Sequence, residues 1–322
     1  MGLFDKPEVT ILKETSDAKD YLEKLETLRK EITDNTEFAS KIDKEIAITK
    51  AGIIGEESIM FELKNSGMDL VVLHDLYIET SDGRGAQIDY LVITPYVNVL
   101  IECKNLFGNI EINSKGEFIR SFQYNGHWIK EGIYSPITQN ERHLTVFKNC
   151  RTENKNIFKR ALADKSFETF NKSLVVLANP KTIVNDKYAP KEIRNKVIRG
   201  DQLINVLKGL KNEFKSSKKE MISYGNNYLA LNRENRKEYI AKFQKFVDEN
   251  NQALTETEEI SNTESLKNDK SDSINQSSDD ETLICPWCGK ELVLRTAKKG
   301  TNTGNQFYGC SGFPKCRYIK NL

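Results

Sequence analysis

Two carboxylates and a lysine lie on neighbouring segments whose residue patterns predict β-strands. Asp89 falls in a run of alternating residues, and Glu102 and Lys104 end the mostly apolar run that begins at Val97. If the hairpin turns at Pro95–Tyr96, Asp89 lies opposite Glu102 and Lys104 projects from the same face. Because directly opposed carboxylates repel each other, this placement favours a divalent cation between them.

A metal held at this point would have a defined chemistry. Asp89 and Glu102 carry the carboxylates that Mg²⁺ prefers, and the main-chain carbonyl of Cys103 is a further oxygen ligand. The metal would lower the pKa of a bound water and neutralise a scissile phosphate, while Lys104 orients that water or stabilises the oxyanion. The same residues also suit a solvent-facing ion pair, because so short a spacing recurs by chance.

The flanking segments supply the elements that must position these residues. A helical pattern opens at Ala51, residues 71–78 predict the first strand, and Ser135 with Pro136 predicts the start of a later helix. Between residues 48 and 144 the chain contains, in order, G-x-x-G-E, Q-I-D, I-E-x-K-N, G-x-I and P-x-x-Q-x-x-x-H. This series resembles the nuclease-related domain family, NERD, a branch of the PD-(D/E)xK restriction-endonuclease-like superfamily.

The resemblance implies an α/β fold with a mixed central sheet flanked by helices, and cleavage of nucleic acid with Mg²⁺ or Mn²⁺. It also implies a catalytic core of Asp89, Glu102 and Lys104, supported by Glu56 and Gln87. The hairpin register places Gln87 opposite Lys104. Glu56 fits two roles, either a residue that reaches the metal or a carboxylate that stabilises a helix N-terminus.

Three other positions belong to the same series. Gln139 and His143 are four residues apart and therefore share a helical face. We expect Gln139 to line the active-site cleft, whereas His143 fits either the cleft or a packed position on the sheet. Cys103 stands where the NERD family usually has an apolar residue, and its side chain is expected to point away from the metal.

Four cysteines near the C-terminal end have the spacing of a metal site. Cys285 and Cys288 form one pair, and Cys310 and Cys316 form a second, which predicts one tetrahedral Zn²⁺ held by four thiolates. Disulfides are the alternative. They are disfavoured because the sequence has no signal-peptide pattern and no extended apolar span, which predicts a cytoplasmic, reduced protein without a membrane segment.

The residues around these cysteines favour nucleic acid as the partner. From Ile284 onward the chain has seven Lys or Arg against one Glu, interleaved with aromatic residues. Residues 283–322 resemble the four-cysteine zinc ribbon of bacterial type I topoisomerases, which implies contact with single-stranded DNA. Cations follow phosphates and aromatic rings stack on unpaired bases, although some rings must fill the small core. The predicted DNA-binding residues are Trp287, Phe307, Tyr308 and Arg317.

Composition divides the chain into four segments. The whole chain is only one charge positive, but residues 141–220 contain nineteen Lys or Arg against nine Asp or Glu, which suits a polyanionic substrate. Residues 251–282 have nine acidic and two basic residues and no aromatic ring, which predicts a flexible tether. The predicted segments are a helical arm (1–47), a nuclease-like α/β domain (48–249), an acidic disordered linker (250–283) and the zinc ribbon (284–322).

These observations favour a divalent-metal-dependent deoxyribonuclease that the ribbon recruits to DNA, in defence or in DNA repair. Two other functions stay open, a DNA-binding protein that no longer cuts and a scaffold that binds proteins. A single active site cuts one strand, so cleavage of a duplex would need a homodimer or successive nicks. The chain contains no P-loop lysine, so any helicase action would come from a partner protein.

Overall fold

The computed structural model describes residues 6–32, 37–153, 155–234, 237–265, 290–296, 306–312 and 318–321. The chain divides into two compact units, residues 1–258 and 259–322. No helix among the described residues is both long enough and apolar enough to cross a membrane.

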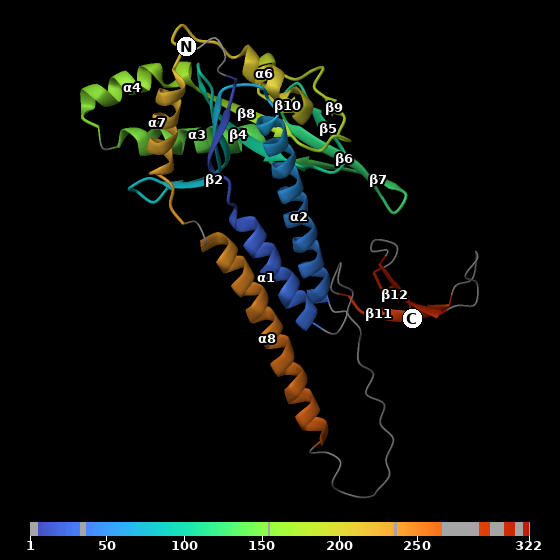
Figure 1. Ribbon diagram of the computed structural model, residues 1–322. Coiled ribbons are helices and arrows are strands. Elements are labelled where there is room, and N and C mark those ends of the chain that lie inside the picture. Colours follow the sequence, from blue (N-terminus) through green and yellow to red (C-terminus); the bar gives the residue numbers. More distant parts are fainter. Residues whose placement is uncertain are drawn as a thin grey trace, which may run out of the picture. The chain divides into compact units, whose positions relative to one another are not determined.

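A six-stranded mixed sheet forms the centre of the first unit (Figure 1). Its three middle strands pair antiparallel, and the outer pairs on both sides are parallel. In spatial order the strands are β1 (Val9–Lys13), β2 (Leu70–Glu79), β3 (Gly85–Ile93), β4 (Asn98–Lys104), β8 (Asn171–Leu177) and β10 (Val197–Arg199).

Helices cover both faces of this sheet (Figure 1), as predicted. Apolar residues of α2 (Glu37–Lys64) and α6 (Leu203–Gly209) pack on one face, and those of α3 (Pro136–Thr152), α4 (Ile157–Phe170) and α7 (Lys218–Leu229) pack on the other. The middle strands are therefore apolar on both sides, which explains the long apolar run that ends in Glu102.

A smaller sheet follows directly from the end of β4. Its strands, in spatial order, are β7 (His127–Ile133), β6 (Phe118–Tyr124), β5 (Asn109–Ile112) and β9 (Val184–Asn185). Ile110, Ile112 and Phe118 are buried together with residues of β8 and α3. Two short helical segments, α5 (Lys191–Arg194) and η1 (Gly200–Gln202), flank β10.

The N-terminal segment differs from the predicted helical arm. Residues 9–13 form β1, an edge strand parallel to β2, before α1 (Asp17–Glu31) begins. The predicted helix start at Ala51 is also wrong, because α2 already begins at Glu37. Parallel pairing with β2, which lies far along the chain, is a long-range contact that local periodicity does not encode.

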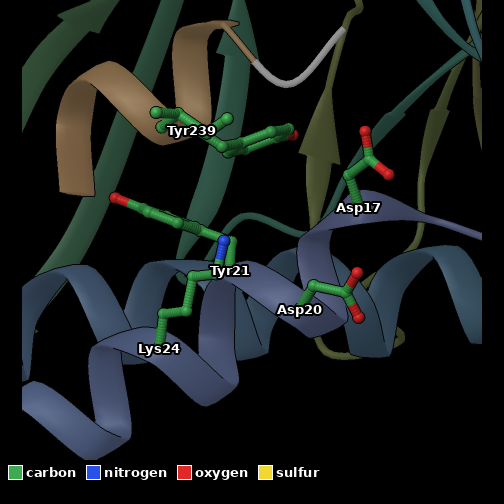
Figure 2. A pocket seen from close by; sticks show the side chains of 6 residues that line it. Asp17, Asp20, Tyr21, Lys24 and Tyr239 are labelled. Atoms are coloured by element: carbon green, nitrogen blue, oxygen red, sulfur yellow. The ribbon is translucent and has the colours of Figure 1, made fainter. Parts of the chain in front are cut away.

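Helix α8 (Lys237–Ser265) extends into the segment predicted to be a disordered linker. Its first turns carry Tyr239, Phe243 and Phe246, which pack on buried residues of α1 and α2. Figure 2 shows Tyr239 beside Tyr21 of α1, with ring centroids 5.1 Å apart. The packing of these aromatic residues fixes the first turns of α8. Elongation of an existing helix is favourable, which explains why α8 continues past the aromatic residues. Residues 266–283 of the predicted linker lie outside the described residues.

The described residues of the second unit form three short antiparallel strands. These are β11 (Leu292–Thr296), β12 (Gln306–Cys310) and β13 (Ile319–Asn321), with β12 in the middle. Leu292 and Cys310 are buried in a small core, with Tyr308 and Tyr318 packed against them.

Candidate active site

Asp89 lies where the pairing of β3 with β4 ends. The two strands pair from Ile93↔Asn98 to Tyr90↔Ile101, the predicted register, whose next step places Asp89 opposite Glu102. There the Asp89 side chain replaces a backbone acceptor, because its Oδ2 accepts a hydrogen bond of 2.7 Å from the Cys103 N–H. The hairpin therefore brings the Asp89 carboxylate against the segment that carries Glu102.

Glu102 is almost completely buried, with 1% of its surface exposed. Its Oε1 lies 2.7 Å from the Nζ of Lys104. Its Oε2 lies 3.4 Å from Nδ1 of His143, but among the described residues neither of these two buried atoms has a hydrogen-bond partner. A buried carboxylate oxygen without a partner is costly, so this position favours a ligand or cation.

The pKa values of the two carboxylates move in opposite directions. Burial, together with the charges of Glu102 and Glu56, raises the pKa of Asp89 well above its usual value. Burial opposes ionisation of Glu102 too, but His143 and Lys104 outweigh it and lower the pKa of Glu102. Ionisation of Asp89 is therefore disfavoured, because Lys104 offsets the neighbouring negative charges and the burial only in part, and a bound divalent metal would relieve this.

Lys104 is held in its charged form at this site. Burial works against the ammonium, but the charge and hydrogen bond of Glu102 and the charge of Asp89 outweigh it and raise the pKa of Lys104. A lysine that stays protonated beside two carboxylates is suited to stabilise developing negative charge.

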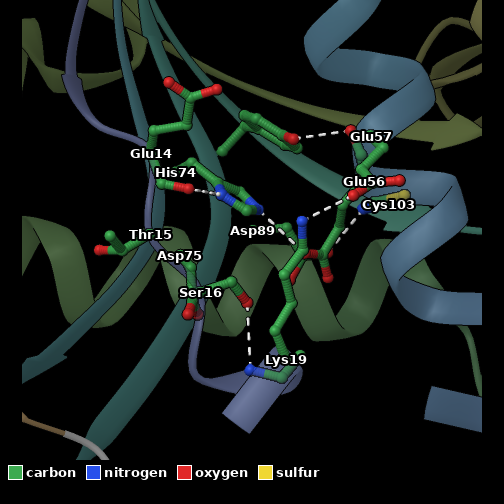
Figure 3. Close-up of polar contacts among 12 residues, drawn as sticks. Glu14, Thr15, Ser16, Lys19, Glu56, Glu57, His74, Asp75, Asp89 and Cys103 are labelled. Carbon is green, nitrogen blue, oxygen red and sulfur yellow. Dashed lines mark hydrogen bonds and ion pairs between the residues drawn. The ribbon is translucent and has the colours of Figure 1, made fainter. Parts of the chain in front are cut away.

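Glu56 points from α2 toward β2 and binds His74 (Figure 3). Nε2 of His74 lies 2.9 Å from Oε2 of Glu56, and Nδ1 lies 3.0 Å from the Glu14 carbonyl. Because a carbonyl only accepts hydrogen bonds, Nδ1 must carry a proton and donate it. Burial opposes the imidazolium, but the hydrogen bonds to Glu56 and to the Glu14 carbonyl, with the charges of Glu56 and Asp75, together outweigh it and raise the pKa of His74.

The position of Glu56 in the middle of α2 excludes one of its two predicted roles. A carboxylate this far from Glu37, where α2 begins, lies outside the first turn, so the role at a helix N-terminus is wrong. Glu56 instead lines the same cleft as Asp89.

Gly55 allows α2 to approach the end of β4. A Cβ atom at this position would lie 2.6 Å from Cβ of Asn105 and 3.2 Å from Sγ of Cys103. Asn105 also donates a hydrogen bond of 2.7 Å to the Ala51 carbonyl of α2. The G-x-x-G-E and I-E-x-K-N motifs thus meet in space, and the glycine sets the distance between the helix that carries Glu56 and the strand that carries Glu102.

We expect Gly55→Ala to destabilise the fold by about 1–3 kcal/mol, because the added methyl overpacks a tight contact with Asn105. Gly52→Ala is the matched control in the same helix. A Cβ atom at Gly52 has no neighbour within 4 Å, so this change should be neutral or stabilise by up to about 1 kcal/mol. Urea unfolding measures both. Equal stability changes for the two variants would contradict the close-approach role of Gly55.

An open cleft of about 770 Å³ lies beside these residues. Gln139 lines it, and so does His143, whose position at Glu102 the sequence left undecided. Gln87 also lines the cleft, but it does not occupy the predicted position opposite Lys104. Within the described strands β3 does not pair with β4 beyond Tyr90, and the Gln87 amide donates to Oδ1 of Asp75 at 2.6 Å. The four-residue spacing from Gln139 was the one sequence signal for His143, and the Glu56–His74 contact had none.

Asp89, which lines the cleft, and the neighbouring Glu102 fit a Mg²⁺ or Mn²⁺ ion. Among the described residues no three His, Cys, Asp or Glu side chains surround a common point. Mg²⁺ does not require this, because it retains several waters and is commonly bound by one or two carboxylates. The unpartnered oxygen of Glu102 and the poorly compensated charge of Asp89 supply such a donor set.

Main-chain geometry adds a third oxygen. The N–H and C=O of one strand residue point to the same side, so the Cys103 carbonyl projects toward β3, as its N–H does. The Cys103 side chain packs with the cluster on the α2 face, away from Glu102, as predicted.

The second unit contains one of the four predicted zinc ligands within its described residues. Cys310 is 2% exposed, and its Sγ accepts a hydrogen bond of 3.2 Å from the Gly312 N–H. Cys285, Cys288 and Cys316 lie outside the described residues, as do Trp287 and Arg317.

The two aromatic residues predicted to bind DNA from β12 differ in their surroundings. Tyr308 packs against the small core that contains Cys310. Phe307 directly precedes Tyr308, so its side chain lies on the opposite face of β12. In the pairing of β12 with β11, Phe307 is opposite Arg295. This placement favours Phe307 over Tyr308 as a stacking surface.

Known family models match the two regions of the chain that contain these residues. Residues 51–178 match the family model of the nuclease-related domain, and residues 283–322 match that of the topoisomerase DNA binding C4 zinc finger. DNA topoisomerase 1 of Methanocaldococcus jannaschii is 42% identical over 43 residues, which cover 13% of this chain and 5% of that protein. The similarity to this relative is therefore confined to one small segment. No solved structure matches the chain.

Proposed function

Since the chain carries a nuclease-related domain of restriction-endonuclease-like fold and a topoisomerase-type zinc ribbon, we propose that it is a metal-dependent nuclease that hydrolyses DNA. One observation carries the proposal. Glu102 is buried with an oxygen that has no hydrogen-bond partner among the described residues, next to a charged Lys104 and opposite an Asp89 whose ionisation is only partly compensated. A purely structural ion pair would leave no buried carboxylate oxygen unsatisfied.

Asp89 and Glu102, with the Cys103 carbonyl, would hold Mg²⁺ or Mn²⁺. When bound, the metal lowers the pKa of a water ligand and offsets charge on the phosphate. Lys104 orients the attacking water or stabilises the oxyanion, because it stays protonated and is anchored by Glu102 at 2.7 Å. His143 lies on the other side of that carboxylate, with its Nδ1 3.4 Å from Oε2 of Glu102.

Glu56, Gln87 and Gln139 would support this centre from the walls of the cleft. His74 holds the Glu56 carboxylate at 2.9 Å, and Asp75 accepts from the Gln87 amide. The side chains of Glu56 and Gln87 are thus each restrained by a hydrogen bond to β2, which preserves their geometry when substrate enters.

The ribbon would deliver single-stranded segments of DNA to the nuclease domain. Four thiolates, from Cys285, Cys288, Cys310 and Cys316, would bind structural Zn²⁺. Phe307, with Trp287 and Arg317, would contact bases and phosphates. Because one chain carries both modules, binding through the ribbon raises the concentration of DNA near the cleft. Defence against foreign DNA and DNA repair both suit this arrangement.

The test is cleavage of single-stranded, duplex and supercoiled DNA with Mg²⁺ or Mn²⁺. We expect metal-dependent cleavage that Lys104→Met lowers by about 100-fold or more, because the charge is lost while the apolar stem is retained. Lys115→Met, in the turn before β6, is the matched control. DNA binding without cleavage by the wild type would instead identify a catalytically silent DNA-binding protein, and a protein with no salt-dependent DNA affinity would be a scaffold.

A further inference from the structure

A second cavity, of about 500 Å³, lies at the opposite end of the central sheet from the active site. Asn98 at the start of β4 lines it, whereas Glu102 is four residues further along that strand, a separation of about 13 Å. Its other walls come from α3, α4, α7 and the segment before α7. A cavity of this volume is in the range of small-molecule sites.

Arg151 of α3 forms the positive centre of this cavity. Its guanidinium lies 5.3 Å from the ring centroid of Phe147, 5.8 Å from that of Phe167 and 5.0 Å from that of Tyr228. Its NH1 donates a hydrogen bond of 3.1 Å to Oδ1 of Asn171. The three rings and the amide hold the guanidinium in one place, as an anion receptor requires.

The amide that orients Arg151 is itself fixed by a buried network. Oδ1 of Asn171 also accepts a hydrogen bond of 2.9 Å from Asn98, and its Nδ2 donates to the Phe167 carbonyl at 2.8 Å. Asn98 donates in addition to the Tyr228 hydroxyl at 3.1 Å. Asn98, Asn171 and Tyr228 are all buried. Such a satisfied network gives the base of the cavity a rigid polar floor.

The charges at this cavity are unbalanced. Lys155 and Lys215 line it with Arg151, and within the described part of the chain none of the three forms an ion pair with an acidic side chain. Glu220, the acidic residue of the lining, is already bound to the N–H and hydroxyl of Ser217 at the start of α7. A guanidinium has five N–H donors, and Arg151 uses one of them in its hydrogen bond with Asn171. The cavity therefore favours an anion.

Aromatic rings form the other part of the lining. Phe170 and Phe214 lie with ring centroids 6.1 Å apart, and Phe214 is 67% exposed. Tyr224 of α7 lines the same cavity and is 40% exposed. Exposed rings beside an anion receptor suit a ligand that joins a negative group to a flat, apolar one.

We infer that this cavity is a nucleotide-binding site, in which Arg151, Lys155 and Lys215 bind the phosphate and Phe170, Phe214 and Tyr224 contact the base. Guanidinium and ammonium groups bind phosphate by charge-assisted hydrogen bonds, and aromatic faces stack on bases of any sequence. The same chemistry would recognise a free nucleotide or the phosphorylated end of a strand. The site is separate from the active site, so it stands whether or not the nuclease proposal does.

Isothermal titration of the full chain, in metal-free buffer, with nucleoside 5′-monophosphates and triphosphates tests the inference. We expect saturable binding to one class of site, and Arg151→Gln and Phe214→Ala should each weaken it at least about tenfold. Lys219→Ala and Phe158→Ala change exposed residues outside the lining and should leave affinity unchanged. Because Phe214 is exposed, its variant should fold normally even if Arg151→Gln does not.

Two partial ligands, inorganic phosphate and an uncharged nucleoside, test whether binding needs both the phosphate and the base. We call them half-ligands. Inorganic phosphate and an uncharged nucleoside should each bind at least about tenfold more weakly than the nucleotide. Equal binding of a half-ligand would overturn the inference, as would no saturation by about 1 mM nucleotide or unchanged affinity in Phe214→Ala. Displacement of the nucleotide by a 5′-phosphorylated oligonucleotide would identify a strand end as the ligand source, and lack of displacement would identify the free nucleotide.

Discussion

Asp89→Asn should lower metal-dependent DNA cleavage by at least about 1,000-fold while making the metal-free protein more stable. A bound metal contributes several kcal/mol of transition-state stabilisation, and each 1.36 kcal/mol corresponds to a factor of ten in rate. Asn retains an oxygen that can accept the hydrogen bond from the Cys103 N–H, so the hairpin keeps its contact. The substitution removes the negative charge of the carboxylate, which a bound cation would need.

The gain in stability has a defined pH dependence. Burial, with Glu102 and Glu56, raises the pKa of Asp89, so the native state binds this proton more tightly than the unfolded state. Stability of the wild type therefore falls as pH rises from the unfolded pKa, about 3.9, toward the raised native pKa. We expect Asp89→Asn to be more stable by about 1 kcal/mol at pH 7 and equal to the wild type below about pH 4.

Urea unfolding without divalent metal, followed over pH, measures this difference. Mg²⁺ should then stabilise the wild type but not Asp89→Asn, because only the wild type provides the complete donor set. Asp201→Asn, at an exposed ion pair with Arg199, is the matched control for both cleavage and stability. Equal stabilisation of wild type and Asp89→Asn by Mg²⁺ would contradict a metal at this position.

Removal of zinc should unfold the C-terminal ribbon and leave the first unit folded. Among the described residues of the ribbon only Leu292 and Cys310 are buried apolar side chains, which is too small a core to fold alone. A structural Zn²⁺ contributes about 10–16 kcal/mol in peptides of this kind, so binding and folding are coupled. Chelation should lower the affinity for single-stranded DNA at least about tenfold, because unfolding of the ribbon removes the ordered surface that presents Phe307 to the bases.

Cys310→Ser should reproduce the effect of the chelator. Zinc content by atomic spectroscopy, circular dichroism and fluorescence anisotropy with a labelled single strand measure the three consequences. Cys150→Ser is the matched control, because Cys150 is a buried thiol of α3 in the other unit. It should leave zinc content and DNA affinity unchanged. A ribbon that keeps its zinc after Cys310→Ser would exclude Cys310 as a ligand.

Local patterns in the sequence correctly predicted the active-site hairpin. Alternation along 87–93, the apolar run to Lys104 and a turn at Pro95–Tyr96 are sufficient for the register, because a slip by one residue would move every apolar side chain to the wrong face. The helix capped by Ser135 followed from an equally local signal. The nuclease-related domain and the zinc ribbon were likewise identified from short ordered motifs.

Other elements depend on contacts between distant parts of the chain. The pairing of β1 with β2 and the packing of α8 on α1 and α2 join segments far apart in sequence. No local pattern encodes such pairs, so the N-terminal arm was predicted to be helical throughout and residues 250–265 to be disordered. The hydrogen-bond partner of Gln87 was likewise not predicted, because Asp75 lies on the neighbouring strand β2.

The sequence by itself determined which residues could do chemistry, since a hairpin with opposed carboxylates and four spaced cysteines are local arrangements. The tertiary structure decided how those residues are held. It placed His143 at the buried oxygen of Glu102, His74 at Glu56, and Gly55 where α2 meets β4. The physical reason is that burial, and therefore pKa and unsatisfied hydrogen bonding, arises only when helices and strands from separate parts of the chain pack together.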